Sequence, residues 1–251
     1  MDLFAHLNLL YLYGNSIYMR QFLLLLTIIF ISQPVLASDK TGNLLRELDE
    51  TIRHRPAYQS RKDAHIHEIK QQLIHATTDE LRYEIYGSLF DEYRGYNTDS
   101  SLVYASRKQD IARKLNKPEY LDDANMNMTE VMGTTGMYME GLALLNSINK
   151  ETLAPYLHSY YYHLYRTFYG LMADYAVTPA ERDEYYRITD LYRDTLLTMH
   201  SSDPVNYTLV RADKLIEHGQ PDEAIQILLD MFNYPADDNR SHSQFAYTLS
   251  Q

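Results

Sequence analysis

A residue pattern that recurs along this chain constrains its fold more than any other feature. The segments 136–145 and 219–228 share one order of residues: Gly, three variable positions, Glu, a small residue, an apolar residue, a variable position, an apolar residue and Leu. A looser copy occupies 96–105, and we expect a fourth at the turn near 177–180. The spacing corresponds to helical hairpins of about 40 residues, so the pattern predicts a train of such hairpins.

The residue types in this pattern have a physical explanation. Glycine adopts the left-handed conformation that ends the first helix of a pair, the role we assign to Gly136 and Gly219. The small residue five positions later, Gly141 or Ala224, lets the second helix approach the first closely. We therefore expect each glycine to mark the turn inside one hairpin.

Helix-capping residues separate the apolar segments. Thr178-Pro179-Ala180-Glu181 is a capping box with proline at the first helical position, Asp203-Pro204 follows the same logic, and Thr77-Thr78-Asp79-Glu80 is a second box. Glycine is scarce, and no stretch alternates with the period of two that indicates a strand. The sequence thus predicts an all-α fold. We expect helices at 41–54, 56–76, 78–95, 98–115, 118–134, 137–148, 151–175, 179–200, 204–218 and 221–233, and a further one from near Ser241.

The segment Arg211 to Ala224 resembles a tetratricopeptide repeat, with a glycine that ends the first helix and a small residue early in the second. This resemblance implies a tetratricopeptide-like solenoid of antiparallel helical hairpins over residues 78–251, with the last repeat incomplete. Residues 38–77 are then N-terminal capping helices.

Residues 19–37 have the layout of a secretory signal peptide. Arg20 precedes a short apolar run, Phe22 to Ile31, and small residues lead to an expected cleavage site after Ala37. The run is too short for a membrane-spanning helix, which needs about 20 residues. We interpret residues 1–18 as a misassigned start; the alternative is a longer signal-anchor. The mature chain is expected in the periplasm.

Composition excludes several classes of function. The formal charge of −11 without a basic block argues against nucleic-acid binding. The lack of cysteine excludes disulfides, thiolate metal sites and a lipid-modified cysteine. His65 and His67 are two positions apart, so a helix directs them away from each other, and we interpret them as surface residues. The carboxylates of Asp122-Asp123 and 181–184 fit helix starts. We expect no catalytic residues, metal or cofactor.

A wider resemblance rests on the segments 44–49, 86–93 and 99–104, together with the signal peptide. These resemble an uncharacterised bacterial family of membrane-bound regulators, in which an exported tetratricopeptide-like sensor region precedes a membrane span, a coiled coil and a DNA-binding part. The resemblance implies that this chain, which ends at Gln251, is a truncated sensor region or finishes in a lone capping helix. Contact with a membrane is then expected only through the signal peptide or a missing C-terminal span.

The 24 tyrosines, without any tryptophan, suggest where a partner binds. In the predicted helix 151–175, one face is apolar, and the opposite face carries Tyr162, Tyr165, Arg166 and Tyr169. First helices of solenoid repeats line the binding surface, and tyrosine supplies rigid contact area with a polar tip. These four residues are our candidate binding site. The alternative is that they pack against the adjacent repeat.

Three functional hypotheses follow. The first is a non-enzymatic exported sensor or binding domain that engages a peptide or protein partner, or a second copy of itself. The second is a glycan-capture protein of an outer-membrane uptake system, which fits less well because the chain has neither Cys nor Trp. The third is an all-α exported enzyme, for which no carboxylate or histidine pair has catalytic spacing.

Overall fold

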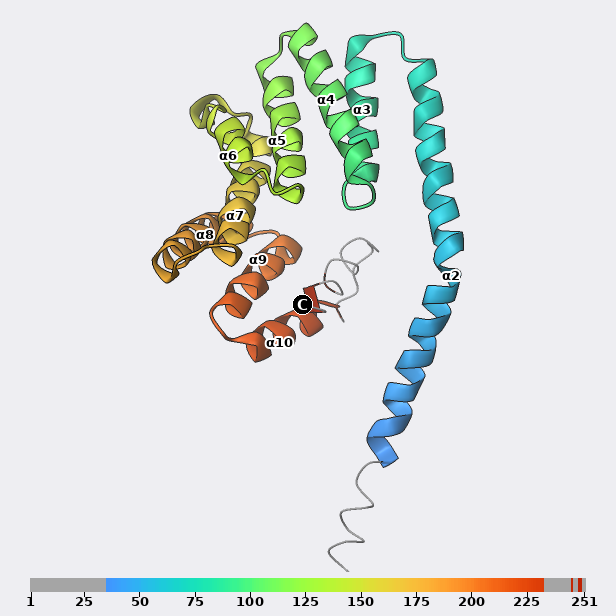
Figure 1. Cartoon of the computed structure of the whole chain (residues 1–251), viewed down its shortest axis with the longest axis vertical. Coiled ribbons are helices and arrows are strands. Elements are labelled where there is room, and N and C mark those ends of the chain that lie inside the picture. The colour runs from blue at the N-terminus through green and yellow to red at the C-terminus, as the bar shows by residue number, and fades with distance from the viewer. Residues whose placement is uncertain (1–34, 233–244, 246–247, 250–251) are drawn as a thin grey trace, which may run out of the picture. The chain divides into compact units, whose positions relative to one another are not determined.

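The computed structural model describes residues 35–232, 245 and 248–249, and all regular structure in this part of the chain is helical (Figure 1). Residues 19–34 of the predicted signal peptide and the predicted helix start near Ser241 lie outside the described residues. The α-helices are α2 (Val35–Ile74), α3 (Asp79–Tyr93), α4 (Thr98–Leu115), α5 (Pro118–Thr134), α6 (Tyr138–Asn146), α7 (His158–Asp174), α8 (Pro179–Met199), α9 (Pro204–Glu217) and α10 (Pro221–Phe232).

The chain divides into two compact units, Met1–His65 and Ile66–Gln251, and α2 contributes residues to both. The prediction of separate helices at 41–54 and 56–76 is wrong, because α2 continues through Pro56. A proline removes one backbone N–H donor and bends a helix, but the backbone hydrogen bonds before and after Pro56 keep this helix continuous. None of the helices within residues 35–232 has the length and apolar composition needed to cross a membrane.

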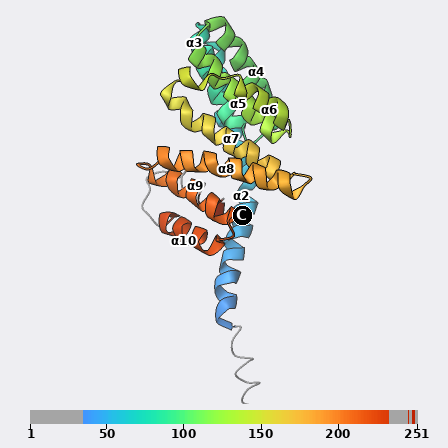
Figure 2. The same ribbon diagram turned by 90° about the vertical axis from the view of Figure 1, so that its left-hand side faces the viewer.

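The second unit is a series of helix pairs, in which α3 packs on α4, α5 on α6, α7 on α8 and α9 on α10. Contacts of α4 with α5 and of α8 with α9 join one pair to the next. Figure 2 shows α7, α8, α9 and α10 following one another as successive layers. The predicted all-α, tetratricopeptide-like solenoid is therefore confirmed, and α3, α5, α7 and α9 are the first helices of its pairs.

The predicted caps start the helices where expected. At α8, the Thr178 hydroxyl accepts a hydrogen bond from the Glu181 amide at 3.2 Å, and the Glu181 carboxylate accepts from the Thr178 amide at 3.1 Å. Asp203 caps α9 by accepting from the Asn206 amide at 3.2 Å. At α3 the cap is Thr78, which accepts from the Leu81 amide at 3.2 Å, so the box predicted at Thr77 to Glu80 is shifted by one residue and Glu80 does not close it. These caps satisfy amides that the first turn of a helix leaves without partners.

The glycines of the repeat pattern take the conformation that the sequence predicts. Gly136 and Gly219 have φ values of +79° and +71°, and each ends the first helix of its pair. A side-chain carbon at Gly141 would lie 3.3 Å from Cβ of Met132 on α5, and would also overlap the ring of Phe168 on α7. The small residue therefore allows close approach within its own pair, as expected, and to the next pair as well.

The predicted helix 151–175 is not continuous. The structure forms two 3-10 turns, Lys150–Thr152 and Pro155–Leu157, before α7 begins at His158. Pro155 has no N–H to donate, and Ala154 before it has the extended backbone that a following proline favours. Leu153 and Leu157 are buried in this connection. These two residues of the expected apolar face therefore pack inward, although they do not belong to one continuous helix with α7.

Most of the hydrophobic core lies between successive helices. Phe90 and Phe168 are the largest apolar side chains at the centres of the two main clusters, on α3 and α7. Phe245 is buried against Ala212, Ala224 and Leu228 of the last pair. The core therefore extends from the end of α2 to α10.

Candidate binding surface

Three of the four predicted site residues are the tyrosines of α7, which pack against the neighbouring helix α8. Tyr165 is buried, and Tyr162 and Tyr169 are half-buried. The ring centroids of Tyr165, Tyr162 and Tyr169 lie 4.8, 6.0 and 6.1 Å from that of Tyr192 on α8. These tyrosines therefore pack within their own helix pair, whereas the alternative left open by the sequence was packing against the adjacent repeat.

Tyr165 also makes polar contacts inside the core. Its hydroxyl donates to the Asn146 side-chain oxygen at 2.5 Å and accepts from the Tyr161 hydroxyl at 3.3 Å. Burial, followed by the bond to Tyr161, raises the pKa of Tyr165 far above its usual range. The side chain is therefore a buried, hydrogen-bonded part of the core.

Arg166, the fourth predicted residue, lies in a charged network that joins α7, α8 and α9. Its guanidinium contacts the carboxylate of Asp213, which also accepts from Arg193 Nε at 2.9 Å. The Arg193 side chain is only 2% exposed, and it also contacts Asp190 at 3.2 Å and Glu217. Burial lowers the pKa of Arg193, but the bond to Glu217 and the charge of Asp213 outweigh burial and raise it.

The structure thus gathers Tyr162, Tyr165 and Tyr169 around Tyr192, and directs Arg166 toward α9. Tyr162, Tyr169 and Arg166 each retain an accessible edge. The hypothesis that the four residues bind a partner stays a prediction.

A polar cavity that the sequence analysis missed lies on the first helices of the solenoid. It measures about 350 Å³ and is formed by α3, α4, α5 and α7. Its lining residues are Glu84, Gly87, Ser88, Asp91, Arg94, Lys108, Asp123, Asn127 and Tyr160.

Lys108 forms the floor of this polar cavity. It belongs to the second helix α4, yet its ammonium reaches between α3 and α5 to donate to Asp123 and Asn127, at 2.7 Å each. The side chain is 8% exposed. The Tyr83 hydroxyl donates to the same Asp123 carboxylate at 2.5 Å, and the Lys108 ammonium lies 4.8 Å from the Tyr83 ring centroid.

A second set of polar contacts forms the wall toward α7. The Tyr160 hydroxyl donates to the Glu130 carboxylate and accepts from the Asn127 amide at 3.3 Å. Arg94 approaches the Glu130 carboxylate at 3.4 Å. Burial and the charge of Glu130 raise the pKa of Tyr160 well above its usual value, so this phenol remains a hydrogen-bond donor.

Two residues of this cavity have sequence positions that favour other roles. Asp123 was expected to be a carboxylate at a helix start, whereas it forms the ion pair with Lys108. Tyr160 has the spacing of the apolar face of the predicted helix 151–175, but its hydroxyl reaches Glu130. Lys108 sits in a polar stretch of α4, where periodicity alone cannot distinguish a buried lysine from a solvated one.

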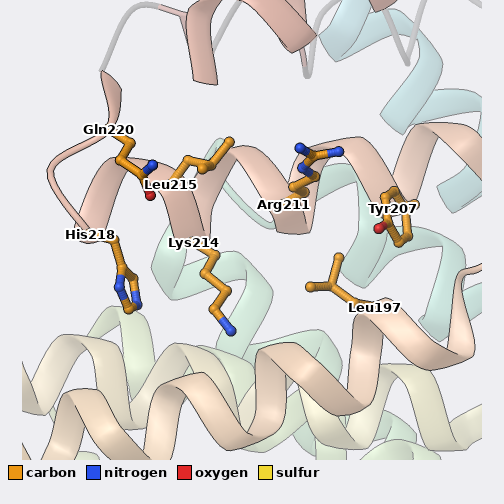
Figure 3. A pocket seen from close by; sticks show the side chains of 7 residues that line it. All are labelled: Leu197, Tyr207, Arg211, Lys214, Leu215, His218 and Gln220. Atoms are coloured by element: carbon orange, nitrogen blue, oxygen red, sulfur yellow. The ribbon is translucent and has the colours of Figure 1, made fainter. Parts of the chain in front are cut away.

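A smaller cavity of about 250 Å³ lies between α8 and α9 (Figure 3). Figure 3 shows Lys214 and His218 extending from α9 toward α8. Lys214 contacts Asp194 at 2.5 Å, and His218 contacts Asp190 at 2.7 Å. Its basic groups therefore already have carboxylate partners. The lining residues are Leu197, Tyr207, Arg211, Lys214, Leu215, His218 and Gln220.

His65 and His67 are both exposed on α2, which confirms their interpretation as surface residues. The His67 ring nitrogen lies 3.2 Å from the side-chain nitrogen of Gln71. No group of three or more potential metal ligands was found among the residues that the structure describes.

The helix pairs and the cavity on their first helices define a tetratricopeptide-type repeat module, a class that generally mediates protein interactions and is generally non-enzymatic. Residues 52–251 match the family model described as the SusR N-terminal TPR domain, so the chain belongs to that family. The family confirms the tetratricopeptide-like resemblance drawn from the sequence. Neither the curated proteins nor the solved structures gave a match.

Proposed function

We propose that this chain is the extracytoplasmic sensor domain of a signalling protein, and that it binds a peptide or protein segment on the first helices α3, α5 and α7. The observation that carries the proposal is the polar cavity, because side chains from three successive first helices meet there. Their hydrogen bonds fix the cavity walls before a partner arrives, which lowers the entropic cost of binding.

The family supports a binding role, and the sequence of residues 19–37 supports export. Tyr162, Arg166 and Tyr169 on α7 are a second proposed contact for the partner, separate from the polar cavity.

A peptide-display selection against the purified full chain tests this proposal. Selected peptides should lose at least about tenfold in affinity for Ser88→Arg, because Ser88 lines the cavity and the larger cation fills it. Ser147→Arg is the matched control: Ser147 is exposed, lines neither cavity and makes a similar bond to its own helix. Failure to select any peptide, or equal loss in both variants, would remove the proposal.

A second candidate function, glycan capture, has one observation in its favour. The cavity combines hydrogen-bond donors and acceptors, such as Asn127 and Tyr160, that can bind sugar hydroxyl groups. A glycan array with the full chain tests it. Binding that Ser88→Arg removes would favour glycan capture over a peptide partner.

A further inference from the structure

The polar cavity carries more negative than positive side chains. Three carboxylates, Glu84, Asp91 and Asp123, line it together with two cations, Arg94 and Lys108. Lys108 is matched by Asp123 at 2.7 Å. Arg94 lies 3.5 Å from Asp91 and is also bound by a carboxylate of α5. Glu84 is exposed, and its carboxylate has no ion pair within the described part of the chain. The unmatched charge of the cavity is therefore negative. A carboxylate without a cationic partner attracts ammonium and guanidinium groups through charge-assisted hydrogen bonds.

Gly87 leaves the space that such a group needs. It lies inside α3, between Glu84 and Asp91, where glycine weakens a helix relative to alanine. A side-chain carbon at this position would lie 3.4 Å from the Lys108 nitrogen. Glycine at this position therefore keeps the cavity open as far as Lys108. This open space offsets the lower helix propensity of glycine.

We propose that the polar cavity receives a basic side chain of the bound peptide, an inference that rests on the proposed function. Its guanidinium or ammonium group binds Glu84, the lining carboxylate that has no ion pair among the described residues. The ion pair of Lys108 with Asp123 provides a fixed, neutral floor, so Glu84 determines the preference for a cation.

Two small probes test this assignment: N-acetyl-arginine amide and its uncharged isostere N-acetyl-citrulline amide. Each is titrated into the purified full chain and followed by ligand-observed NMR. The arginine probe should bind about tenfold more tightly, as expected for one charge-assisted contact. Glu84→Gln should remove this preference. Glu184→Gln, the same change at an exposed carboxylate on α8, should leave it intact.

Gly87→Ala provides a test that changes no charge. The added methyl group reduces the space beside Lys108, so affinity for the arginine probe should fall several-fold while the melting temperature does not fall. Unchanged affinity would overturn the assignment of the cavity floor.

Equal binding of the two probes, or a preference that survives Glu84→Gln, would overturn the inference. Display-selected peptides without Lys or Arg that Ser88→Arg still blocks would overturn it while leaving the proposed function in place. Binding of a neutral oligosaccharide in the cavity, with no response to the arginine probe, would also overturn it.

Discussion

At the scale of single residues, two helical glycines have opposite surroundings. Gly87 borders the polar cavity, and the nearest atoms to an added side-chain carbon are 3.4 Å or more away, at the flexible end of Lys108. Gly141 is enclosed by Phe168 and by Met132, with Cβ of Met132 at 3.3 Å. The sequence pattern identified Gly141 as a packing residue, but it contained nothing about Gly87.

Alanine substitutions at these two glycines should therefore change stability in opposite directions. Gly87→Ala should raise the free energy of unfolding by about 0.5–1 kcal/mol through helix propensity. Gly141→Ala should lower it by about 1–2 kcal/mol, because overpacking against Phe168 outweighs the same propensity gain. Urea denaturation of both variants checks this; a loss of stability in Gly87→Ala would contradict the description of its surroundings.

Residue identity alone could not locate the polar cavity. Lys108 and Asp123 come from different helices, and only the packing of α4 on α5 brings them together. Tyr165 shows a different limit of prediction from sequence. The sequence predicts that Tyr165 lies on a helix, but whether its face of the helix meets solvent or α8 depends on where α8 packs.

At the scale of helices, the sequence predicted where helices start better than where they are interrupted. Caps such as Thr178 and Asp203 act within one turn, so local sequence specifies them. A proline did not by itself predict whether a helix is interrupted: Pro56 lies inside a continuous helix, whereas Pro155 lies in a short turn before α7. Tertiary packing decides between these two outcomes, and tertiary packing cannot be read from a single sequence.

The contact between α7 and α8 should make stability sensitive to alkaline pH. Burial, and then neighbouring tyrosines, raise the pKa of Tyr192 to about 12, whereas tyrosine in an unfolded chain titrates near 10. Because the folded state keeps the proton more tightly, the stabilisation is complete below pH ~10 and is lost as the pH rises toward 12.

Urea unfolding between pH 8 and pH 11 measures this effect. The free energy of unfolding should fall above pH ~10, and Tyr192→Phe should make the fall shallower. Tyr175→Phe, at a tyrosine that is 72% exposed, serves as the control. A fall that is equally steep in Tyr192→Phe and in the unmodified chain would contradict the assignment to Tyr192.

Arg193 joins three helices, and its loss should weaken them together. Arg193→Met leaves Asp213 and Glu217 without their buried partner, and should cost about 3 kcal/mol of unfolding free energy. Arg187→Met removes an exposed pair with Glu184 on the same helix, and should cause no measurable change. Thermal and urea denaturation compare the two variants, and similar stabilities would contradict a structural role for the Arg193 network.

At the scale of the whole molecule, the helix pairs and the SusR N-terminal TPR family define a binding module, and our proposal that it works outside the cytoplasm rests on the sequence of residues 19–37. The repeat pattern was enough to predict the solenoid, since each pair uses local turns and close helix contacts. The partner could not be predicted, because recognition depends on side chains that several pairs bring together.

The proposed export leads to a prediction about the N-terminus of the exported protein. N-terminal sequencing of the protein recovered outside the cytoplasm should begin at Ser38, because signal peptidase cuts after small residues such as Ala37. An intact Met1 or Met19 in the recovered protein would contradict the predicted cleavage.

The central claim is that a peptide binds in the polar cavity of the first helices, and photocrosslinking tests it most directly. The display-selected peptide carries a photoreactive p-benzoylphenylalanine, its complex with the unmodified full chain is irradiated, and the crosslinked residues are mapped by mass spectrometry. We predict crosslinks to residues that line the cavity, such as Ser88 and Asn127, and none to Ser147. Crosslinking to Ser147 equal to that in the cavity, or no crosslink in the cavity with a peptide that binds, would contradict the claim.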